Sequence, residues 1–338
     1  MDDEHYLLNP NENYSYEYLL NETNVCEMGG YFVFYTHLTP VLYTLAFLLS
    51  LLGNSLVLWI LFKYENLTSL TNVCITNLCI SDLAFSCMLP FLAAAQAFGW
   101  IFGEFLCKAV NAVFSIGYYS GVFFLTLMTI LRYLAVVNPL STLRSQMRCC
   151  GFLVSLVVWT GSILIVVPEV IHTTVQEILE GHKICDYAVW KWKKVDIYQR
   201  NVLFLLSFGV IVFCYFKILI ILLGTRSRRK HRTVKLILII VVAFFLCWAP
   251  YNILSFLRTL PPPTCQYDKD SSLAFYISRK IAFSHCCLNP VLYVFVGVKF
   301  KRHFLRLGDQ CLPCGNGQVS SPRVCSEGKF HYEDASIY

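Results

Sequence analysis

Charge is scarce in this sequence. Only 14% of its 338 residues are charged, against roughly 25% in an average soluble protein. In contrast, 57% are hydrophobic and the mean hydropathy is +0.57. A soluble chain of this length would form two or three domains, each needing a polar surface that this charge cannot supply. The same figures exclude disordered, collagen-like and coiled-coil proteins. The composition therefore predicts a protein that crosses a membrane several times.

The sequence also lacks the patterns of several other classes. No basic segment followed by an apolar one opens the chain, so we expect no cleavable signal peptide. Two matching halves with Gly- or Pro-broken spans would indicate a transporter, and the sequence has no such pair. A nucleophile–base pair or an HExxH motif would indicate an intramembrane enzyme, and the sequence has neither. We therefore expect neither transport nor enzymatic activity.

Long apolar segments account for most of the chain. A helix needs about 20 mostly apolar residues to cross the hydrocarbon core of a bilayer, and seven segments meet that requirement. They are continuous rather than alternating every second residue, which argues against a β-barrel. We therefore expect an all-α membrane protein, a seven-transmembrane helix bundle with spans at 36–62, 73–97, 105–137, 149–171, 197–224, 233–257 and 273–298.

The segments outside the spans complete a four-part organisation. Residues 1–35 form an acidic tail, and the bundle occupies 36–298. Residues 299–310 contain the amphipathic sequence KFKRHFLR, which favours a short helix lying along the membrane. Residues 311–338 form a second polar tail.

The two sides of the bundle differ in charge. Residues 1–35 carry seven acidic residues and no Lys or Arg, whereas basic residues follow the third, fifth and seventh spans. Because Lys and Arg collect on the cytosolic side of multi-pass proteins, we expect the amino terminus outside the cell and the carboxyl terminus inside. Asn13 and Asn21 then lie in glycosylation sequons on the outer side.

The sixteen cysteines divide by compartment. Seven lie in the spans, where we expect them to pack as small apolar residues. Cys311 and Cys314 have the spacing of a metal or redox pair, but their position beside the membrane favours palmitoylation. Four cysteines face an oxidising space in which three pairings are open, namely Cys26, Cys107, Cys185 and Cys265.

One short motif stands in each predicted span. These are Gly53-Asn54, LCISD (Leu78–Asp82), Arg132-Tyr133, Trp159, Tyr215, CWAP (Cys247–Pro250) and NPVLY (Asn289–Tyr293). In this order they resemble the rhodopsin class of seven-helix receptors over residues 36–310. RYLAVVNPL (132–140), SHCCLNPVLYVFVGVKF (284–300) and the four outer cysteines resemble chemokine receptors. LLGNSLVLW, KHRTVKLI and VFVGVKF are most similar to the XC-type, or lymphotactin, branch.

The resemblance implies a plasma-membrane receptor that binds an XC-type chemokine outside the cell. Inside, it would activate a heterotrimeric G protein of the inhibitory class and drive chemotaxis and calcium signalling. Arrestin and membrane lipid are further implied partners, and nucleic acid is not. The alternative is a scavenging receptor that internalises chemokine without activating a G protein, which Leu131 and Arg279 favour as departures from the family pattern.

The resemblance assigns the outer residues to ligand binding. It pairs Cys107 with Cys185 and Cys26 with Cys265. Tail tyrosines among acidic residues are candidates for sulfation, and an acidic tail would attract a basic chemokine in a salt-dependent way. The implied ligand-binding residues are Tyr6, Tyr14, Tyr16, Tyr18, Tyr43, Glu104, Tyr118, Tyr119, Glu169, Tyr251 and Arg279.

Arg279 departs from the family pattern. Most chemokine receptors carry a Glu there, which meets the amino-terminal amine of the chemokine. Glu169 or Glu104 would have to take that role in this chain.

Asp82 is the most informative residue inside a span. A carboxylate in the middle of a bilayer costs at least ~2.5–3.5 kcal/mol, so Asp82 should face the bundle interior and find partners there. The candidates for these partners are Asn54, His285 and Asn289. The resemblance implies a sodium ion at Asp82, although His285, Gly117 and Gly121 depart from the usual polar lining.

The resemblance also implies an activation switch and a cytosolic contact surface. An acid normally precedes Arg132 and holds it at rest, so Leu131 predicts either higher basal activity or another partner. The implied switch residues are Asp82, Arg132, Tyr133, Tyr215, Phe244, Trp248, Pro250, His285, Asn289, Pro290 and Tyr293. The implied G-protein contacts, for which anionic lipid is the alternative partner, are Arg132, Arg226, Arg228, Arg229, Lys230, Lys235 and Lys299.

Overall fold

The computed structural model describes residues 29–65, 67, 69–137, 148–179, 181–223, 228–261 and 265–296. For some of these residues it describes the backbone alone, namely 29–36, 148–149, 179, 222–223, 228–233, 235–236, 265–266, 268 and 294–296.

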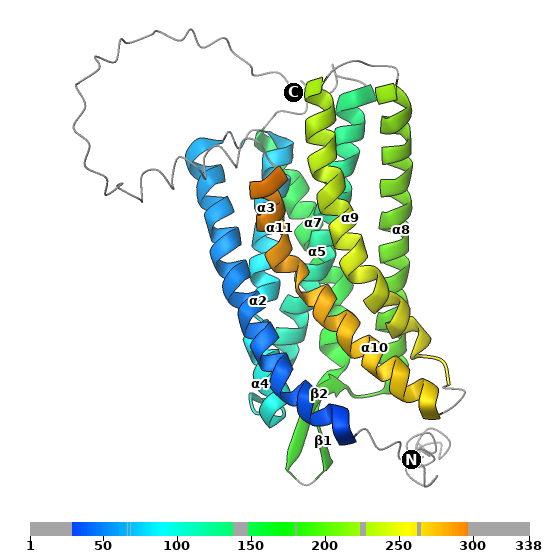
Figure 1. Ribbon diagram of the computed structural model, residues 1–338. Coiled ribbons are helices and arrows are strands. Elements are labelled where there is room, and N and C mark those ends of the chain that lie inside the picture. The colour runs from blue at the N-terminus through cyan, green and yellow to red at the C-terminus, as the bar shows by residue number, and fades with distance from the viewer. Residues whose placement is uncertain are drawn as a thin grey trace, which may run out of the picture.

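Helices make up most of the described chain (Figure 1). Five spans are single helices: α2 (Gly29–Tyr64), α5 (Gly103–Val137), α7 (Arg148–His172), α8 (Trp190–Leu223) and α9 (Arg228–Leu257). Two spans are each divided, the second into α3 (Leu70–Ser86) and α4 (Leu89–Phe98), the last into α10 (Cys265–Phe283) and α11 (His285–Val296). The predicted seven-helix bundle is therefore confirmed.

Helix ends differ from the hydropathy limits. α2 begins at Gly29 and α8 at Trp190, against 36 and 197 for the predicted spans. At α8 helical hydrogen bonding continues into the charged sequence WKWKKVD, so hydropathy marks only the apolar part of that helix. In the described residues six helical spans are long and apolar enough to cross a membrane. The seventh falls short because α10 opens with polar and charged residues.

A β-hairpin joins α7 to α8, and the sequence analysis did not predict it. β1 (Thr173–Leu179) pairs antiparallel with β2 (His182–Tyr187) at one end of the bundle, where α2 begins (Figure 1). The charge distribution places this hairpin end outside the cell. Cys185 in β2 forms a disulfide with Cys107 at the start of α5, which confirms that pairing. The all-α class therefore describes the bundle and not this connection.

Large side chains fill the centre of the bundle. Trp248, Tyr118, Phe85, Phe244 and Phe283 are all at most 2% exposed. Large apolar residues also cover the outside of the helices, which matches a lipid surrounding. Because apolar residues occur both inside the bundle and on its outer surface, it is the buried polar groups that distinguish the interior from that surface.

Trp159, one of the sequence motifs, holds two helices together. Its indole Nε1 on α7 donates to Asn77 Oδ1 on α3 at 2.9 Å, and Asn77 Nδ2 donates to Ser155 Oγ at 2.8 Å. Both bonds join α7 to α3, so this motif has a packing function in the structure.

Candidate functional site

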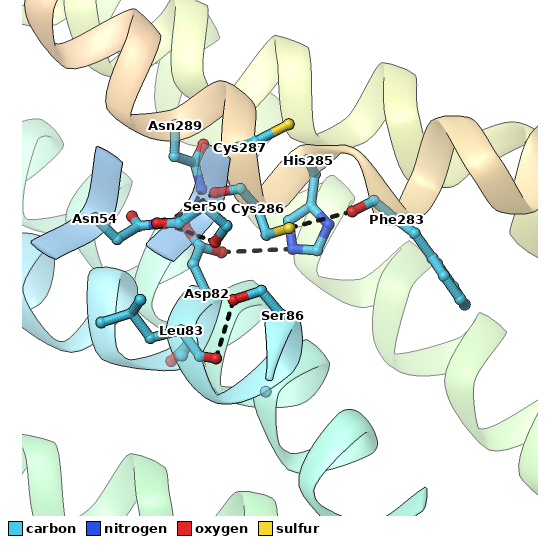
Figure 2. Close-up of polar contacts among 12 residues, drawn as sticks. Ser50, Asn54, Asp82, Leu83, Ser86, Phe283, His285, Cys286, Cys287 and Asn289 are labelled. Atoms are coloured by element: carbon cyan, nitrogen blue, oxygen red, sulfur yellow. Dashed lines mark hydrogen bonds and ion pairs between the residues drawn. The ribbon is translucent and has the colours of Figure 1, made fainter. Parts of the chain in front are cut away.

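The first polar cluster surrounds Asp82 in the middle of the bundle (Figure 2). The Asp82 side chain is 2% exposed, and Asn289 Nδ2 donates to its Oδ2 at 2.7 Å. His285 Nε2 lies 3.5 Å from Oδ1. Two of the three candidate partners therefore contact the carboxylate. We call Asp82, His285 and Asn289, with Asn54, the central cluster.

Asn54 has a different partner, which Pro290 explains. A proline has no N–H, so the carbonyl four residues before it loses its helical hydrogen bond. That carbonyl belongs to Cys286, and Asn54 Nδ2 donates to it at 2.9 Å (Figure 2). A Cβ on Gly53 would lie 2.8 Å from Pro290, so the lack of a side chain there permits the approach of α2 to α11. The Gly53-Asn54 motif of the first span thus packs against the NPVLY motif of the last span.

His285 has its proton positions restricted by its neighbours. Its Nδ1 lies 2.7 Å from the carbonyl oxygen of Ala282, which can only accept, so Nδ1 carries the hydrogen. The other nitrogen, Nε2, faces Asp82 Oδ1. Two bare lone pairs would repel there, so this contact is favourable only when one of the two atoms carries a proton. The pair then has no net charge and needs no further cation.

His285 also touches the aromatic core. Its ring centroid lies 4.8 Å from that of Phe85, 5.2 Å from that of Trp248 and 5.5 Å from that of Phe244. Phe244, one turn before Trp248, packs beside it at 6.1 Å between centroids, as we expected. One imidazole therefore contacts both the buried carboxylate and the tryptophan of α9.

The residues around Asp82 do not fit a sodium ion. Both carboxylate oxygens already face a partner, and Gly117 and Gly121 on the facing helix offer no side-chain oxygen. The nearby hydroxyls of Ser81 and Ser120 bond each other at 2.8 Å. In the part of the chain that the structure describes, no group of three His, Cys, Asp or Glu gathers for a metal.

The second polar cluster lies nearer the hairpin end. Arg200 is 8% exposed, and its Nη2 lies 2.9 Å from Asp196 Oδ2, one turn earlier on α8. Its guanidinium carbon lies 5.6 Å from the centroid of the Tyr118 ring. Glu169 is 7% exposed and interacts electrostatically with both Asp196 and Arg200. Its Oε2 accepts no hydrogen bond from the described residues.

Glu169 was predicted from the sequence, but its two neighbours on α8, Asp196 and Arg200, were not. The available signal was the spacing of Asp196 and Arg200, four residues apart at the start of an apolar span. That spacing places both side chains on one face of a helix, where they form an ion pair. Periodicity alone did not indicate that this face turns toward Glu169.

Arg279 on α10 completes the second cluster. Its guanidinium carbon lies 5.2 Å from the centroid of the Phe283 ring, and it interacts electrostatically with Tyr43 and Tyr251. Arg200 also interacts with Tyr251, so the two guanidinium groups share this neighbour. We call the set the outer cluster, and its members are Tyr43, Tyr118, Glu169, Asp196, Arg200, Tyr251 and Arg279.

Trp248 connects the two clusters. The Tyr118 ring centroid lies 4.3 Å from that of Trp248, and the Tyr251 centroid lies 5.6 Å away. Asn252 Nδ2 donates to the Trp248 carbonyl at 3.0 Å. With His285 on its other side, Trp248 lies between the outer and central clusters. A rearrangement at one cluster therefore has a short packed route to the other.

Glu104 and Tyr119 lie close to the outer cluster but in different surroundings. The exposed Glu104 carboxylate accepts the Val175 N–H at 2.8 Å and pairs with Lys108 at 3.3 Å. It thereby fixes β1 to the start of α5. Tyr119 is 1% exposed, and its ring packs against Tyr118 at 5.2 Å.

Arg132 has a partner at the opposite end of the bundle. Its Nη2 donates to Thr71 Oγ1 on α3 at 3.1 Å, while Leu131 packs against the core. It also interacts electrostatically with Tyr215 and Cys74. Arg132 Nε lacks a hydrogen-bond partner in the described residues. In the absence of a preceding acid, Thr71 is therefore the group that holds Arg132.

The remaining switch residues lie on α5, α9 and α11. The Tyr133 ring lies 6.3 Å from that of Phe213 on α8, and Tyr293 on α11 is buried near Asp82. Pro250 lies inside α9 and Pro290 inside α11.

Several expectations concern residues outside the described part of the chain. These residues are Tyr6, Asn13, Tyr14, Tyr16, Tyr18, Asn21, Cys26, Arg226, Lys299, Cys311 and Cys314, together with the amphipathic segment 299–310. The side chains of four proposed G-protein contacts and of one cysteine are also outside it: Arg228, Arg229, Lys230, Lys235 and Cys265. Their roles stay predictions.

Comparisons with known proteins agree with this geometry. Residues 53–293 match the family 7 transmembrane receptor (rhodopsin family). The chain is 49% identical over 323 residues to Chemokine XC receptor 1 of Homo sapiens, covering 94% of this chain and 95% of that protein. It is 50% identical over 328 residues to Chemokine XC receptor 1 of Mus musculus, covering 96% and 98%.

A more distant similarity extends to another branch. C-C chemokine receptor type 4 of Homo sapiens is 37% identical over 295 residues, covering 85% of this chain and 82% of that protein. The family match spans most of the bundle, and these relatives align over nearly the whole chain. The chain therefore belongs to the rhodopsin family of seven-transmembrane receptors and, within it, to the chemokine receptors.

Proposed function

We propose that this chain is the receptor for an XC-type chemokine and that it activates a heterotrimeric G protein of the inhibitory class. The observation that carries the proposal is the near-complete alignment, at 49% and 50% identity, with two proteins named Chemokine XC receptor 1. Identity at this level over both extramembrane and membrane segments supports a shared ligand class.

Family membership sets the general frame. The chain is a multi-pass receptor of the plasma membrane and a signalling protein, not an enzyme. Chemokines and G proteins are the partners that the family implies. Arrestin and membrane lipid are further partners within the proposal.

Ligand binding would act by shifting a population. A ligand favours the active state only by as much as it binds that state better than the resting one. The outer cluster offers charged and aromatic groups to a ligand, and Tyr118 lies 4.3 Å from Trp248 between ring centroids. Trp248 in turn contacts His285, which faces Asp82. A changed position of Trp248 would therefore alter the packing of α9 and α11 together.

The inner half would convert that change into G-protein contact. Pro250 removes one helical hydrogen bond from α9 and makes it the natural hinge. Movement of the cytosolic half of α9 would uncover Arg132, which must leave Thr71 before it can reach a partner. The basic residues between α8 and α9 would then contact the G protein.

A scavenging receptor is the second candidate, and Leu131 is the observation that favours it. The acid that normally precedes Arg132 is absent. The bond from Arg132 to Thr71 weighs against this candidate, because it supplies another resting contact for the arginine.

The test is G-protein activation in cells that express this chain, with and without an XC-type chemokine. We expect a chemokine-dependent response that an Arg132→Ala variant loses while it still binds the ligand. Binding without any response in the unaltered chain would support the scavenging receptor. Absence of binding would overturn the ligand assignment and leave the family unchanged.

A further inference from the structure

Arg279 is a charged group whose environment is incomplete. In the described residues no carboxylate oxygen lies within 4.0 Å of its guanidinium, whereas Arg200 has Asp196 at 2.9 Å. Arg279 is half-buried, and a half-buried guanidinium with no anion beside it is incompletely compensated. The two arginines of the outer cluster therefore differ: Arg200 is paired with a carboxylate within the chain, and Arg279 has no carboxylate partner in the described residues.

A second donor next to Arg279 is also unused. Tyr43 is 3% exposed, and its hydroxyl has no hydrogen-bond partner in the part of the chain that is described. Tyr43 is also the strongest electrostatic neighbour of Arg279. An O–H and a guanidinium that lie together without an acceptor form a donor set suited to an oxygen anion.

The charges around this donor set leave it positive. Asp186 is the acid that interacts with Arg279 over a longer range, but it is already paired with Lys193 at 2.5 Å. The other cation that interacts with Arg279 is Arg200, which is paired with Asp196. Glu169 and Asp196 lie on the opposite side of the outer cluster, on α7 and α8. The unpaired positive charge of the cluster thus lies toward α10.

We infer that Arg279, with the Tyr43 hydroxyl, binds a carboxylate of an Asp or Glu side chain in the chemokine segment that enters the bundle. This inference rests on the proposed function and names the chemistry that selects the ligand. A planar guanidinium binds a carboxylate through two parallel hydrogen bonds, and a lysine cannot reproduce that geometry. Arg279 is therefore a specificity-determining residue for acidic ligand segments.

Lys280 provides a matched control on the same helix. Its Nζ lies 4.0 Å from the centroid of the Tyr43 ring and 4.5 Å from that of Tyr276. Two ring faces already surround this nitrogen, so the inference gives it no ligand carboxylate. Lys280→Gln removes a basic side chain from the next residue along α10.

The experiment measures G-protein activation by an XC-type chemokine, with receptor at the cell surface quantified through an epitope tag. The receptor variants are Arg279→Gln, Arg279→Glu, Arg279→Lys and Lys280→Gln. The ligand variants change each Asp or Glu of the chemokine amino-terminal segment to its amide, one at a time. A charge-assisted bond supports roughly tenfold to hundredfold in potency.

We expect Arg279→Gln to lower potency at least about tenfold and Arg279→Glu to lower it further, with Lys280→Gln within about threefold. One amide variant of the chemokine should lose as much on the unaltered receptor and nothing more on Arg279→Gln, because the two changes remove one contact. Arg279→Lys should restore only part of the potency.

Two results would overturn the inference. One is unchanged potency of Arg279→Gln at equal surface expression. The other is full additivity of every amide variant with Arg279→Gln, which would show that no ligand carboxylate meets Arg279. Both leave the receptor assignment standing. A lack of response in the unaltered receptor would overturn the proposed function and this inference together.

Discussion

The central and outer clusters are both polar sites in an apolar bundle. Each holds a neutral oxygen without a hydrogen-bond partner in the described residues, Asn54 Oδ1 and the Tyr43 hydroxyl, but the clusters differ in how completely their charged groups are paired. Both oxygens of Asp82 face a partner, and Asn54 satisfies the carbonyl that Pro290 leaves open. In the outer cluster Glu169 Oε2, the Tyr43 hydroxyl and Arg279 have no such partner in the described residues.

This difference teaches what each cluster is built for. Buried polar groups are normally hydrogen-bonded. A charged group whose partners lie within the chain therefore holds one arrangement of helices, and a charged group without such partners invites a ligand. The central cluster should therefore act on the balance between receptor states, while the outer cluster should act on binding. Four predictions test this contrast.

The largest effect is expected from breaking the one complete pair of the outer cluster. Asp196→Asn breaks the 2.9 Å ion pair of the buried Arg200, and breaking a buried ion pair costs roughly 3–5 kcal/mol. The purified receptor should lose about 3 kcal/mol of stability by that estimate, seen as a lower melting temperature. Glu169→Gln is the control, since Glu169 forms no ion pair within 4.0 Å in the described residues. Equal losses in the two variants would contradict the assignment of Arg200 to Asp196.

The next effect separates binding from activation. Asp82→Asn keeps an oxygen for Asn289 but replaces the carboxyl oxygen that faces His285 with an amide nitrogen. We expect it to shift the balance of resting and active states by about 2 kcal/mol, or about thirtyfold. Because Asp82 contacts no ligand in this scheme, a radioligand with equal affinity for both states should bind the variant within about threefold of the unaltered receptor. A larger loss of affinity for that radioligand would refute the contrast.

A smaller effect is expected at the cytosolic end. Thr71→Ala removes the hydrogen bond that holds Arg132, worth about 1 kcal/mol, so basal G-protein activity should rise about fivefold. Thr76→Ala is the matched control, because that hydroxyl bonds only the Asn72 carbonyl of its own helix at 2.9 Å. Thr71→Ser should keep the resting level. If Thr71→Ala and Thr76→Ala have the same basal activity, Thr71 does not restrain Arg132.

The smallest effect is expected from sodium. Because both Asp82 oxygens face a partner and the Ser81 and Ser120 hydroxyls bond each other, replacing sodium by choline at constant ionic strength should change basal activity and agonist potency less than about twofold. A change of tenfold or more would mean that a sodium ion displaces one of these contacts.

Much of the fold could be predicted because local sequence dictates it. A run of apolar residues long enough to span a bilayer must form a helix there, since the backbone has no water to bond. The need of Asp82 for polar partners follows from its position alone. Trp248 and Phe244 share a helix face through their spacing, and the structure confirms that they pack together.

Other features depended on which helices meet, and spacing along the chain does not contain that information. The pair of Asp196 and Arg200 was visible as a spacing, but its place beside Glu169 was not. The break at Ser284, which divides α10 from α11 and lets His285 face Asp82, also lay hidden inside one apolar span.

The sequence by itself determined the spans, the orientation and the residue types that a membrane interior must neutralise. The free energy of transferring apolar side chains into the bilayer and the cost of leaving backbone groups without hydrogen bonds there are local, additive quantities. They can therefore be summed along the chain. Only the tertiary structure decided that the pair of Arg200 and Asp196 lies beside Glu169, and that no carboxylate of the described residues lies within 4.0 Å of Arg279. That outcome depends on distances between helices far apart in the chain, and those distances arise only when the bundle packs.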